Sequence, residues 1–216
     1  MDFLISDEQK QLQDLIHQFI QKDYPFDVRE KLVKTEEGFS KDFWKTFSQF
    51  GLLAMPFSEE DGGFNGGPVD IMIILEAFGT GLIVEPYIPN IVLSGNLVSK
   101  LGSKDQKDAI LPHLLNGDMQ LAFAFSEPQS RFDLNDVTTA AEKDGDGYKL
   151  NGYKCVVMNG PAADKLIVSA RTAGSQLDEN GISLFIVDRE TKGVSLRDYS
   201  NVDGSKASEL TLEDVV

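Results

Sequence analysis

Residues 110–125 read ILPHLLNGDMQLAFAF, and the hydrophobic pattern of the chain changes within this stretch. Before Asn116 the apolar residues recur at intervals of three and four, which is typical of an amphipathic helix. From Leu121 onward they follow a period of two, which is typical of a β-strand. Because helical patterns precede this point and strand patterns follow it, we predict an α+β fold. A helical domain is expected over residues 1–119 and a β domain over residues 120–216.

Five helices are predicted in the first half, and several of their starts carry a recognisable signal. Ser6 and Ser103 each begin a capping box, in which a serine and a glutamine three residues later satisfy the first free amides of a helix. Ser40 can cap a further helix, and Pro68 stands where a helix tolerates proline, at its first position. The predicted helices cover residues 6–20, 40–50, 68–78, 87–101 and 103–115.

Eight short strands are predicted in the second half, with turn-forming sequences between several of them. Turns are predicted at Asp144-Gly145-Asp146-Gly147, at Asn151-Gly152 and at Asp178-Glu179-Asn180-Gly181, because Asn-Gly and Asp-Gly pairs favour hairpin turns. The strands are expected at residues 121–125, 137–142, 148–150, 153–158, 166–171, 182–188, 194–199 and 209–215.

The composition argues against several classes of protein. The 216 residues include 35 acidic and 20 basic ones, which gives a formal net charge of -15. A nucleic-acid binder needs clustered Lys and Arg to neutralise phosphates, so we expect no nucleic-acid partner. No apolar run reaches the ~18 residues of a membrane-spanning helix, and residues 1–8 lack the basic and apolar segments of a signal peptide. Since Cys155 is the lone cysteine, a reducing, cytoplasmic location is the simplest expectation.

Single motifs do not identify a reaction. His17 and His113 lie in predicted helices, far in sequence from Cys155, so we predict neither a metal site nor a histidine-based triad. The glycine-rich residues 62–67 lack the spacing of a dinucleotide-binding loop, and we interpret them as a connection between helices. Cys155 alternates with neighbours in an apolar strand and is interpreted as a buried thiol.

A series of short sequence segments along the chain carries more information than any single motif. In the second half they include FAFSEP at 123–128, LNGYK at 150–154 and VSAR at 168–171, and in the first half GLLAMP at 51–56, EAFG at 76–79 and GSKDQK at 102–107. In these segments the chain resembles the acyl-CoA dehydrogenase family, flavoproteins that oxidise acyl-CoA thioesters. The resemblance covers essentially the whole chain. Within the family, Arg131-Phe132-Asp133 is most similar to the branch described as the pimeloyl-CoA dehydrogenase small subunit.

The resemblance implies a fold and a division of roles. Family members have an N-terminal helical domain, an antiparallel, β-barrel-like middle domain and a C-terminal four-helix domain, and this chain matches the first two. The flavin lies between the middle and C-terminal domains, and the glutamate that removes the α-proton is usually on the C-terminal domain. The resemblance therefore implies FAD as cofactor, an acyl-CoA as substrate and no catalytic base in this chain. It also implies homo- or hetero-oligomers with other chains of the family, and an electron-transfer flavoprotein as partner.

Five residues match family positions beside the flavin ring. Ser126 matches a hydroxyl residue that bonds the ring, although a hydroxyl at a strand end also suits a cap on local backbone. Phe123 and Phe125 match flanking positions, although alternating aromatics are also typical of a core. Val156 and Met158 stand where the family has a tryptophan that packs on the flavin and a threonine that bonds near its reactive nitrogen. Val156 and Met158 can still pack against the flavin, but they cannot provide the aromatic stacking or the side-chain hydrogen bond.

The phosphate side of the flavin site departs further from the family pattern. The glycine-rich stretch that approaches the pyrophosphate is replaced here by QSRFD at residues 129–133. Arg131 can pair with a phosphate, since a guanidinium suits bidentate contact with phosphate oxygens. It can equally form a structural ion pair with Asp133 or Asp136.

Three functions are consistent with these residues. The first is the N-terminal two-thirds of an acyl-CoA dehydrogenase, and it is favoured because the chain stops after a strand where family members continue. The second is a non-catalytic subunit that completes the flavin site of a partner chain. The third is an interaction module that has lost the cofactor. Bound FAD would separate the first two functions from the third.

Overall fold

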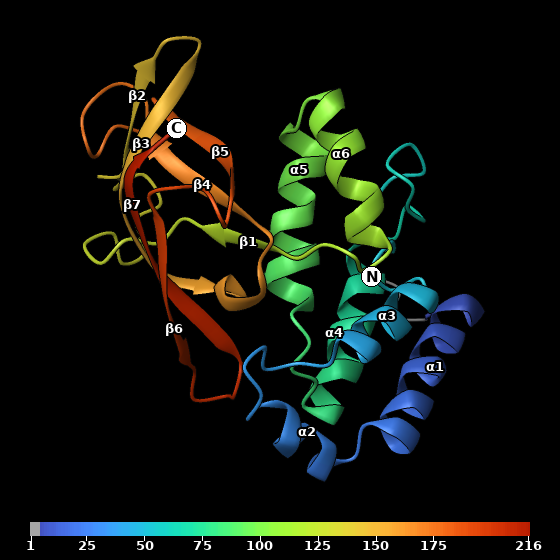
Figure 1. The fold of residues 1–216 in the computed structure, drawn as a ribbon. Coiled ribbons are helices and arrows are strands. Elements are labelled where there is room, and N and C mark those ends of the chain that lie inside the picture. The colour runs from blue at the N-terminus through green and yellow to red at the C-terminus, as the bar shows by residue number, and fades with distance from the viewer. Residues whose placement is uncertain (1–4) are drawn as a thin grey trace. The chain divides into compact units, whose positions relative to one another are not determined.

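Helices precede strands along the chain in the computed structural model, which describes residues 5–216 (Figure 1). The helical unit contains the described residues up to Tyr87 together with Gly95–Asp118, and the β unit contains Ile88–Ser94 with Met119–Val216. The predicted α+β class is confirmed. The division at residues 119 and 120 stays a prediction, and so does the absence of a signal peptide, because part of that stretch lies outside the described residues.

Four of the predicted helix starts, those of α1, α3, α4 and α6, are confirmed in the helical unit. Its α-helices are α1 (Asp7–Asp23), α2 (Phe26–Leu32), α3 (Lys41–Gln49), α4 (Pro68–Gly81), α5 (Asn96–Leu101) and α6 (Lys104–Leu115). Ser6 and Ser103 form the two capping boxes, and Ser40 Oγ accepts a hydrogen bond from the Phe43 amide at 3.2 Å. Pro68 is the first residue of α4.

Two parts of the helix prediction are wrong. The short helix α2 was missed, because none of its residues is buried and it shows no apolar stripe. Residues 87–101 do not form one α-helix, since Tyr87–Gly95 is a π-helix that leads into α5. Asn90, in this π-helix, is completely buried and belongs with the β unit, where it bonds Gln120 Oε1 at 2.8 Å and the Leu121 amide at 2.9 Å.

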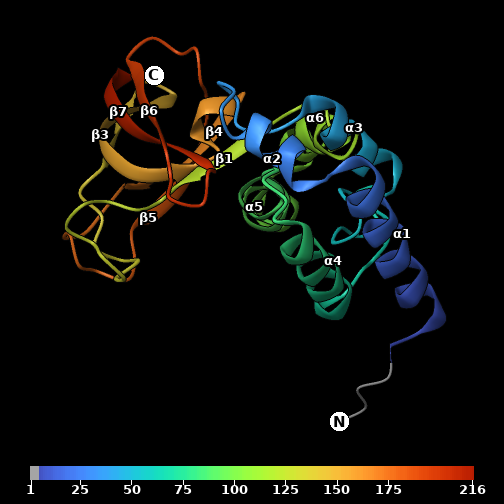
Figure 2. The ribbon, with the colours of Figure 1, turned by 90° about the horizontal axis from the view of Figure 1, so that it is seen from below.

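The core of the helical unit is aromatic. Phe47 and Phe78 are stacked with ring centroids 4.9 Å apart, and Phe19 meets Phe47 edge to face at 5.3 Å. Trp44 is buried beside them, and the hydroxyl of buried Tyr87 donates to the Leu52 carbonyl at 2.9 Å. Helices α1 and α4 lie side by side over this core (Figure 2). None of the helices in residues 5–216 is both long and apolar enough to span a membrane.

The β unit is one curled, mixed sheet. Its strands are β1 (Leu121–Ala124), β2 (Ala140–Asp144), β3 (Gly147–Met158), β4 (Lys165–Arg171), β5 (Ile182–Asp188), β6 (Val194–Ser200) and β7 (Lys206–Val215). They lie in the order β1-β4-β2-β3-β7-β6, with β5 also paired to β4. Most pairs are antiparallel, as expected, but β4 runs parallel to β1 and β2. The β2–β3 hairpin intervenes in sequence between β1 and β4, and parallel strands need a long connection of this kind.

One predicted turn is wrong in the β unit. Residues Asn151 and Gly152 lie inside β3, so that the two strands expected at 148–150 and 153–158 are one. The pairing of β3 with β7 is irregular here, between Leu150 and Gly152. A Cβ at Gly152 would lie 2.5 Å from Thr139 Oγ1, so the glycine permits close approach of the residue that precedes β2 rather than a turn. The turn at 144–147 is confirmed, and it joins β2 to β3.

Candidate functional site

The predicted ring-side residues come from two segments that the sheet brings together. Phe123 lies on β1, and Phe125 and Ser126 follow directly after it, while Val156 and Met158 lie near the end of β3. The backbone amide of Cys155 donates to the Ser126 carbonyl at 2.9 Å, and the Cys155 thiol points to Ser126 Oγ at 3.7 Å. Cys155 is half-buried rather than buried, which corrects the expectation for its thiol.

A β-bulge shapes the β3 side of this site. The register of β3 against β7 shifts between Lys154 and Val157, so one extra residue is accommodated at Cys155 and Val156. Val156 has a φ of 52°, which is rare for a β-branched residue, and its side chain is 50% exposed. A bulge of this kind redirects a side chain away from the regular ladder, and bulges are frequent beside active sites. Val156 is therefore exposed next to Cys155, the residue that contacts Ser126.

Replacing Val156 by glycine tests whether this backbone is strained. A non-glycine residue in the left-handed region costs about 1–2 kcal/mol, whereas glycine adds about 0.5–1 kcal/mol of unfolded-state entropy. We expect Val156→Gly to leave the free energy of unfolding unchanged or to raise it slightly, as measured by urea denaturation. The control is Val157→Gly, which removes a completely buried side chain and is expected to cost at least about 2 kcal/mol. Equal losses in both variants would show that the Val156 backbone is not strained.

The two phenylalanines lie on the less buried face of the strand. Ala122 and Ala124 are completely buried, while Phe123 and Phe125 are half-buried, with ring centroids 4.9 Å apart. The alternation along β1 therefore places small residues in the core and aromatic rings toward the surface. This arrangement leaves the rings accessible to a ligand that lies on this face.

The Ser126 hydroxyl does not cap the local backbone. That role belongs to Ser130, whose Oγ accepts from the Glu127 amide at 3.2 Å and donates to the Glu127 carbonyl at 2.9 Å. Within the described chain, the contact of Ser126 Oγ is the Cys155 thiol. A thiol is a weak donor, so the hydroxyl can still donate to a ligand.

Arg131 lies in the connection from β1 to β2, and we name residues 127–139 of this connection the Arg131 loop. Its φ is 48°, its side chain is exposed, and it makes no ion pair or hydrogen bond with residues 5–216. The ion pair with Asp133 or Asp136 is therefore not formed. Asp136 Oδ1 instead accepts from Gln176 Nε2 at 2.7 Å.

Sequence reasoning missed a buried ion pair beneath this loop. Glu127 and Lys154 are both completely buried, with Oε1 and Nζ 2.7 Å apart. Burial alone would raise the pKa of Glu127, but hydrogen bonds from Lys154, Thr138, Thr139 and Gln129 lower it to about 2. Burial lowers the pKa of Lys154, and its bond to Glu127 opposes that shift. The signal was present in the sequence, because a lysine at an inward position of an apolar strand needs a buried partner.

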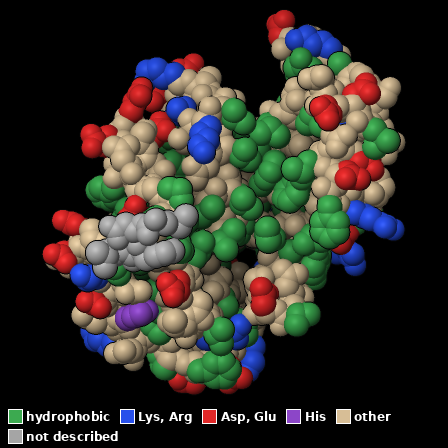
Figure 3. All heavy atoms as spheres, turned by 180° about the vertical axis from the view of Figure 1, so that it is seen from behind, with side chains coloured by type: hydrophobic (Ala, Val, Ile, Leu, Met, Phe, Trp, Pro, Cys, Tyr) green, Lys and Arg blue, Asp and Glu red, His purple; other side chains and the backbone are tan. Residues whose placement is uncertain are grey.

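Exposed apolar side chains accompany these polar groups. In the β unit they include Phe132, which is 98% exposed, together with Leu134, Val156 and Leu177. Leu177 lies beside the Arg131 loop, since its carbonyl accepts from Asn135 Nδ2 at 2.6 Å. Hydrophobic patches among charged side chains are visible on the molecular surface in Figure 3. The candidate site thus offers a hydroxyl, a guanidinium without a partner among the described residues, and apolar surface.

Comparisons with known proteins match both halves of the chain. The family models described as acyl-CoA dehydrogenase, N-terminal domain, and acyl-CoA dehydrogenase, middle domain, match residues 6–118 and 122–215. The short-chain specific acyl-CoA dehydrogenase of Clostridium acetobutylicum is 30% identical over 100% of this chain and 58% of its own length. The mitochondrial 2-methylacyl-CoA dehydrogenase of Solanum tuberosum is 34% identical over 97% of this chain and 52% of its own.

Solved structures agree with these sequence matches. Butyryl-CoA dehydrogenase from Megasphaera elsdenii superposes with a TM-score of 0.83 and 28% identity, covering 100% of this chain and 58% of that one. The chain therefore spans a little more than half the length of the curated relatives it matches.

Proposed function

The chain belongs to the acyl-CoA dehydrogenase family, and we propose that it supplies the N-terminal and middle domains of an FAD-dependent enzyme that oxidises an acyl-CoA thioester. The observation that carries this proposal is the match of both family domains, in order, along the chain. The domains are proposed to divide at residues 119 and 120, as the sequence pattern predicts.

The residues of the candidate site fit a flavin in their donor chemistry. FAD combines a flat ring, whose edge accepts hydrogen bonds, with a negatively charged pyrophosphate. Ser126 Oγ would donate to the ring edge, and Phe123, Phe125, Val156 and Met158 would provide apolar surface beside the ring. Arg131 would hold a phosphate through its planar guanidinium. The Met158 side chain cannot donate a hydrogen bond, so it would contribute only packing against the ring.

In the proposed reaction the acyl-CoA loses a proton from its α-carbon and a hydride from its β-carbon, and FAD, when bound, would supply the hydride acceptor. None of the site residues described above is placed as the base. Its absence costs roughly 10²–10⁴ in rate when a general base is needed. We therefore propose that residues 1–216 alone do not dehydrogenate acyl-CoA, and that the base comes from further sequence or from a partner chain of the family. Electron-transfer flavoprotein is the proposed electron acceptor, and the cytoplasm the proposed compartment.

The cofactor role is tested by replacing Arg131 with alanine and titrating the protein with FAD and with riboflavin, which lacks phosphate. A hydrogen bond to a charged group contributes about 1.5–3 kcal/mol, so FAD affinity should fall about tenfold to hundredfold while riboflavin affinity is unchanged. The loss should be larger at low salt, because salt screens charge pairs at the surface.

Arg197 provides the matched control for this experiment. It is an exposed arginine on β6 that pairs with Glu209, so Arg197→Ala removes the same charge without touching the site. If Arg131→Ala and Arg197→Ala have equal effects, Arg131 does not contact a phosphate. Absence of FAD binding even in the presence of the further sequence or partner chain that supplies the base would contradict the proposed function itself.

A further inference from the structure

The carboxylate of Glu127 accepts hydrogen bonds from both ends of the Arg131 loop. Glu127 Oε2 accepts from Gln129 Nε2 at 2.7 Å and from the Thr138 amide at 2.8 Å, and it also accepts from the Thr138 hydroxyl. Glu127 Oε1 accepts from the Thr139 amide at 3.0 Å. Glu127 lies at the start of the loop and Thr138 and Thr139 at its end. The carboxylate therefore closes the loop at its base.

Gln129 adds hydrogen bonds within the loop itself. Besides bonding Glu127, its Nε2 lies 3.3 Å from the Asp136 carbonyl and 3.3 Å from Asp136 Oδ1. Gln129 thus joins the two limbs of the loop on either side of Arg131. Arg131 is exposed and has no protein partner among residues 5–216, so the position of its guanidinium depends on the loop backbone.

Lys154 connects the same carboxylate to the ring side of the site. Its Nζ bonds Glu127 Oε1 at 2.7 Å and Ser169 Oγ at 3.0 Å, and it approaches the Phe125 carbonyl at 3.5 Å. Lys154 directly precedes the bulge at Cys155 and Val156. The buried pair therefore contacts the segments that carry the ring-side residues as well as both ends of the Arg131 loop.

We propose that the Glu127–Lys154 pair, acting through Gln129, is a positioning device that sets the Arg131 loop in the conformation that binds the phosphate of the cofactor. This inference rests on the proposed function. A buried ion pair adds little stability over a well-packed apolar pair, because desolvation offsets much of the attraction. Its directional hydrogen bonds instead define one arrangement of a loop whose tip is exposed. Preorganisation of this kind raises affinity by reducing the ordering required on binding.

The test uses Gln129→Ala, because Gln129 is exposed and its loss leaves the ion pair intact. FAD and riboflavin affinities are measured by titration, and amide hydrogen exchange is followed over residues 127–139. We expect FAD affinity to fall about tenfold with riboflavin affinity unchanged, and exchange in the loop to accelerate severalfold without a shift in the urea midpoint. The matched control is Gln49→Ala, the same change at an exposed glutamine of α3, which should alter neither affinity nor loop exchange.

A second variant removes the pair while keeping its volume. In the double variant Glu127→Gln, Lys154→Met we expect the same selective loss of FAD affinity, and a larger one. If the wild type binds FAD and Gln129→Ala retains that affinity, the positioning role is wrong while the proposed function stands. Equal losses for FAD and riboflavin would also overturn it, because the effect would not be confined to the phosphate. If the wild type binds no FAD even in the presence of the further sequence or partner chain that supplies the base, the proposed function fails, and this inference with it.

Discussion

Lys154→Met is expected to destabilise the β unit by about 3–5 kcal/mol, because it leaves the carboxylate of Glu127 buried without its cation. Both side chains are completely buried in the wild type, and their charged atoms lie 2.7 Å apart. A loss of this size is a large part of the stability of a typical domain. The measurement is urea unfolding at pH 7, followed by far-ultraviolet circular dichroism.

The double variant Glu127→Gln, Lys154→Met is the informative comparison for this prediction. It removes both charges, and most of the lost stability should return, since an uncharged pair of similar volume is often as stable as a buried ion pair. Lys192→Met is the matched control, because Lys192 is exposed and has no ion pair among the residues that the structure describes. If the single variant costs less than 1 kcal/mol, water or another cation must reach Glu127.

The loss of stability at low pH reports on the same carboxylate of Glu127. The pKa of Glu127 is lowered to about 2 in the folded protein, against an ordinary value of 4.5. A carboxyl with a lowered pKa stabilises the fold fully above about pH 4.5, and this contribution is lost as the pH falls toward 2. The contribution of Glu127 to the loss of stability in acid should therefore be absent from the double variant, which has no carboxyl at residue 127.

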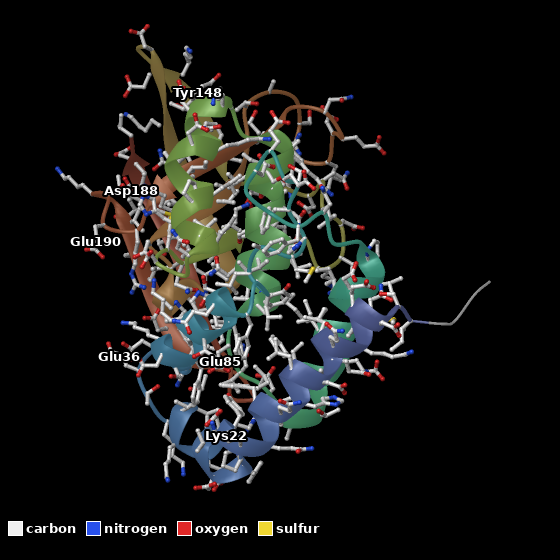
Figure 4. All side chains as sticks on the ribbon, turned by 90° about the vertical axis from the view of Figure 1, so that its right-hand side faces the viewer. Lys22, Glu36, Glu85, Tyr148, Asp188 and Glu190 are labelled. Carbon is white, nitrogen blue, oxygen red and sulfur yellow. The ribbon has the colours of Figure 1, made fainter. Side chains whose placement is uncertain are left out.

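The helical unit is expected to lose roughly 3 kcal/mol of stability as the pH rises from about 4.5 to about 7, because of Glu85. Burial raises the pKa of Glu85 to about 7 from an ordinary value of 4.5, although hydrogen bonds, including one from the Ser40 amide at 3.3 Å, partly oppose the shift. Its Oε2 is buried without a hydrogen-bond partner among the described residues. Figure 4 shows Glu85 within the helical unit.

The sign of this pH dependence follows from proton binding. Between pH 4.5 and 7 the folded protein keeps a proton on Glu85 that the unfolded chain has released, so rising pH favours unfolding. Glu85→Gln imitates the protonated form, and the variant should be as stable at pH 7.5 as at pH 5. Trp44, the single tryptophan and buried in this unit, reports unfolding by its fluorescence in urea.

Glu76→Gln provides the control for Glu85→Gln. Glu76 is an exposed glutamate on α4 of the same unit, and its replacement should leave the pH dependence as in the wild type. If Glu85→Gln also leaves it unchanged, the carboxyl is ionised in the folded protein, and a solvent path to Glu85 Oε2 must exist.

Much of the fold could be predicted from sequence because the signals are local. Ser6 and Ser103 cap helices through partners three residues away, and the turn at 144–147 joins adjacent strands. The period of two after Leu121 reflects which side chains of each strand face the core. The prediction failed at Asn151-Gly152, where the glycine that favours a turn instead permits a close contact with Thr139.

The candidate site was predictable only in part. The resemblance named Ser126, Arg131 and Val156, but it left the partners of Ser126 and Arg131 open. The structure shows that Ser130 caps the local backbone in place of Ser126, and that the aspartates near Arg131 do not pair with it. Which side chain takes which partner depends on the path of a loop, and no local pattern specifies that path.

The sequence by itself determined the α+β class, the order of most elements and the family to which the chain belongs. Each of these rests on hydrophobic periodicity, helix caps or short sequence segments that extend over a few neighbouring residues. Tertiary structure alone decided the bulge that exposes Val156, the π-helix at Tyr87–Gly95 and the burial of Glu127 against Lys154. Glu127 and Lys154 are 27 residues apart in sequence. The folded sheet excludes water from both charges. Because a buried charge is costly unless it is paired, each of the two stabilises the other inside the protein.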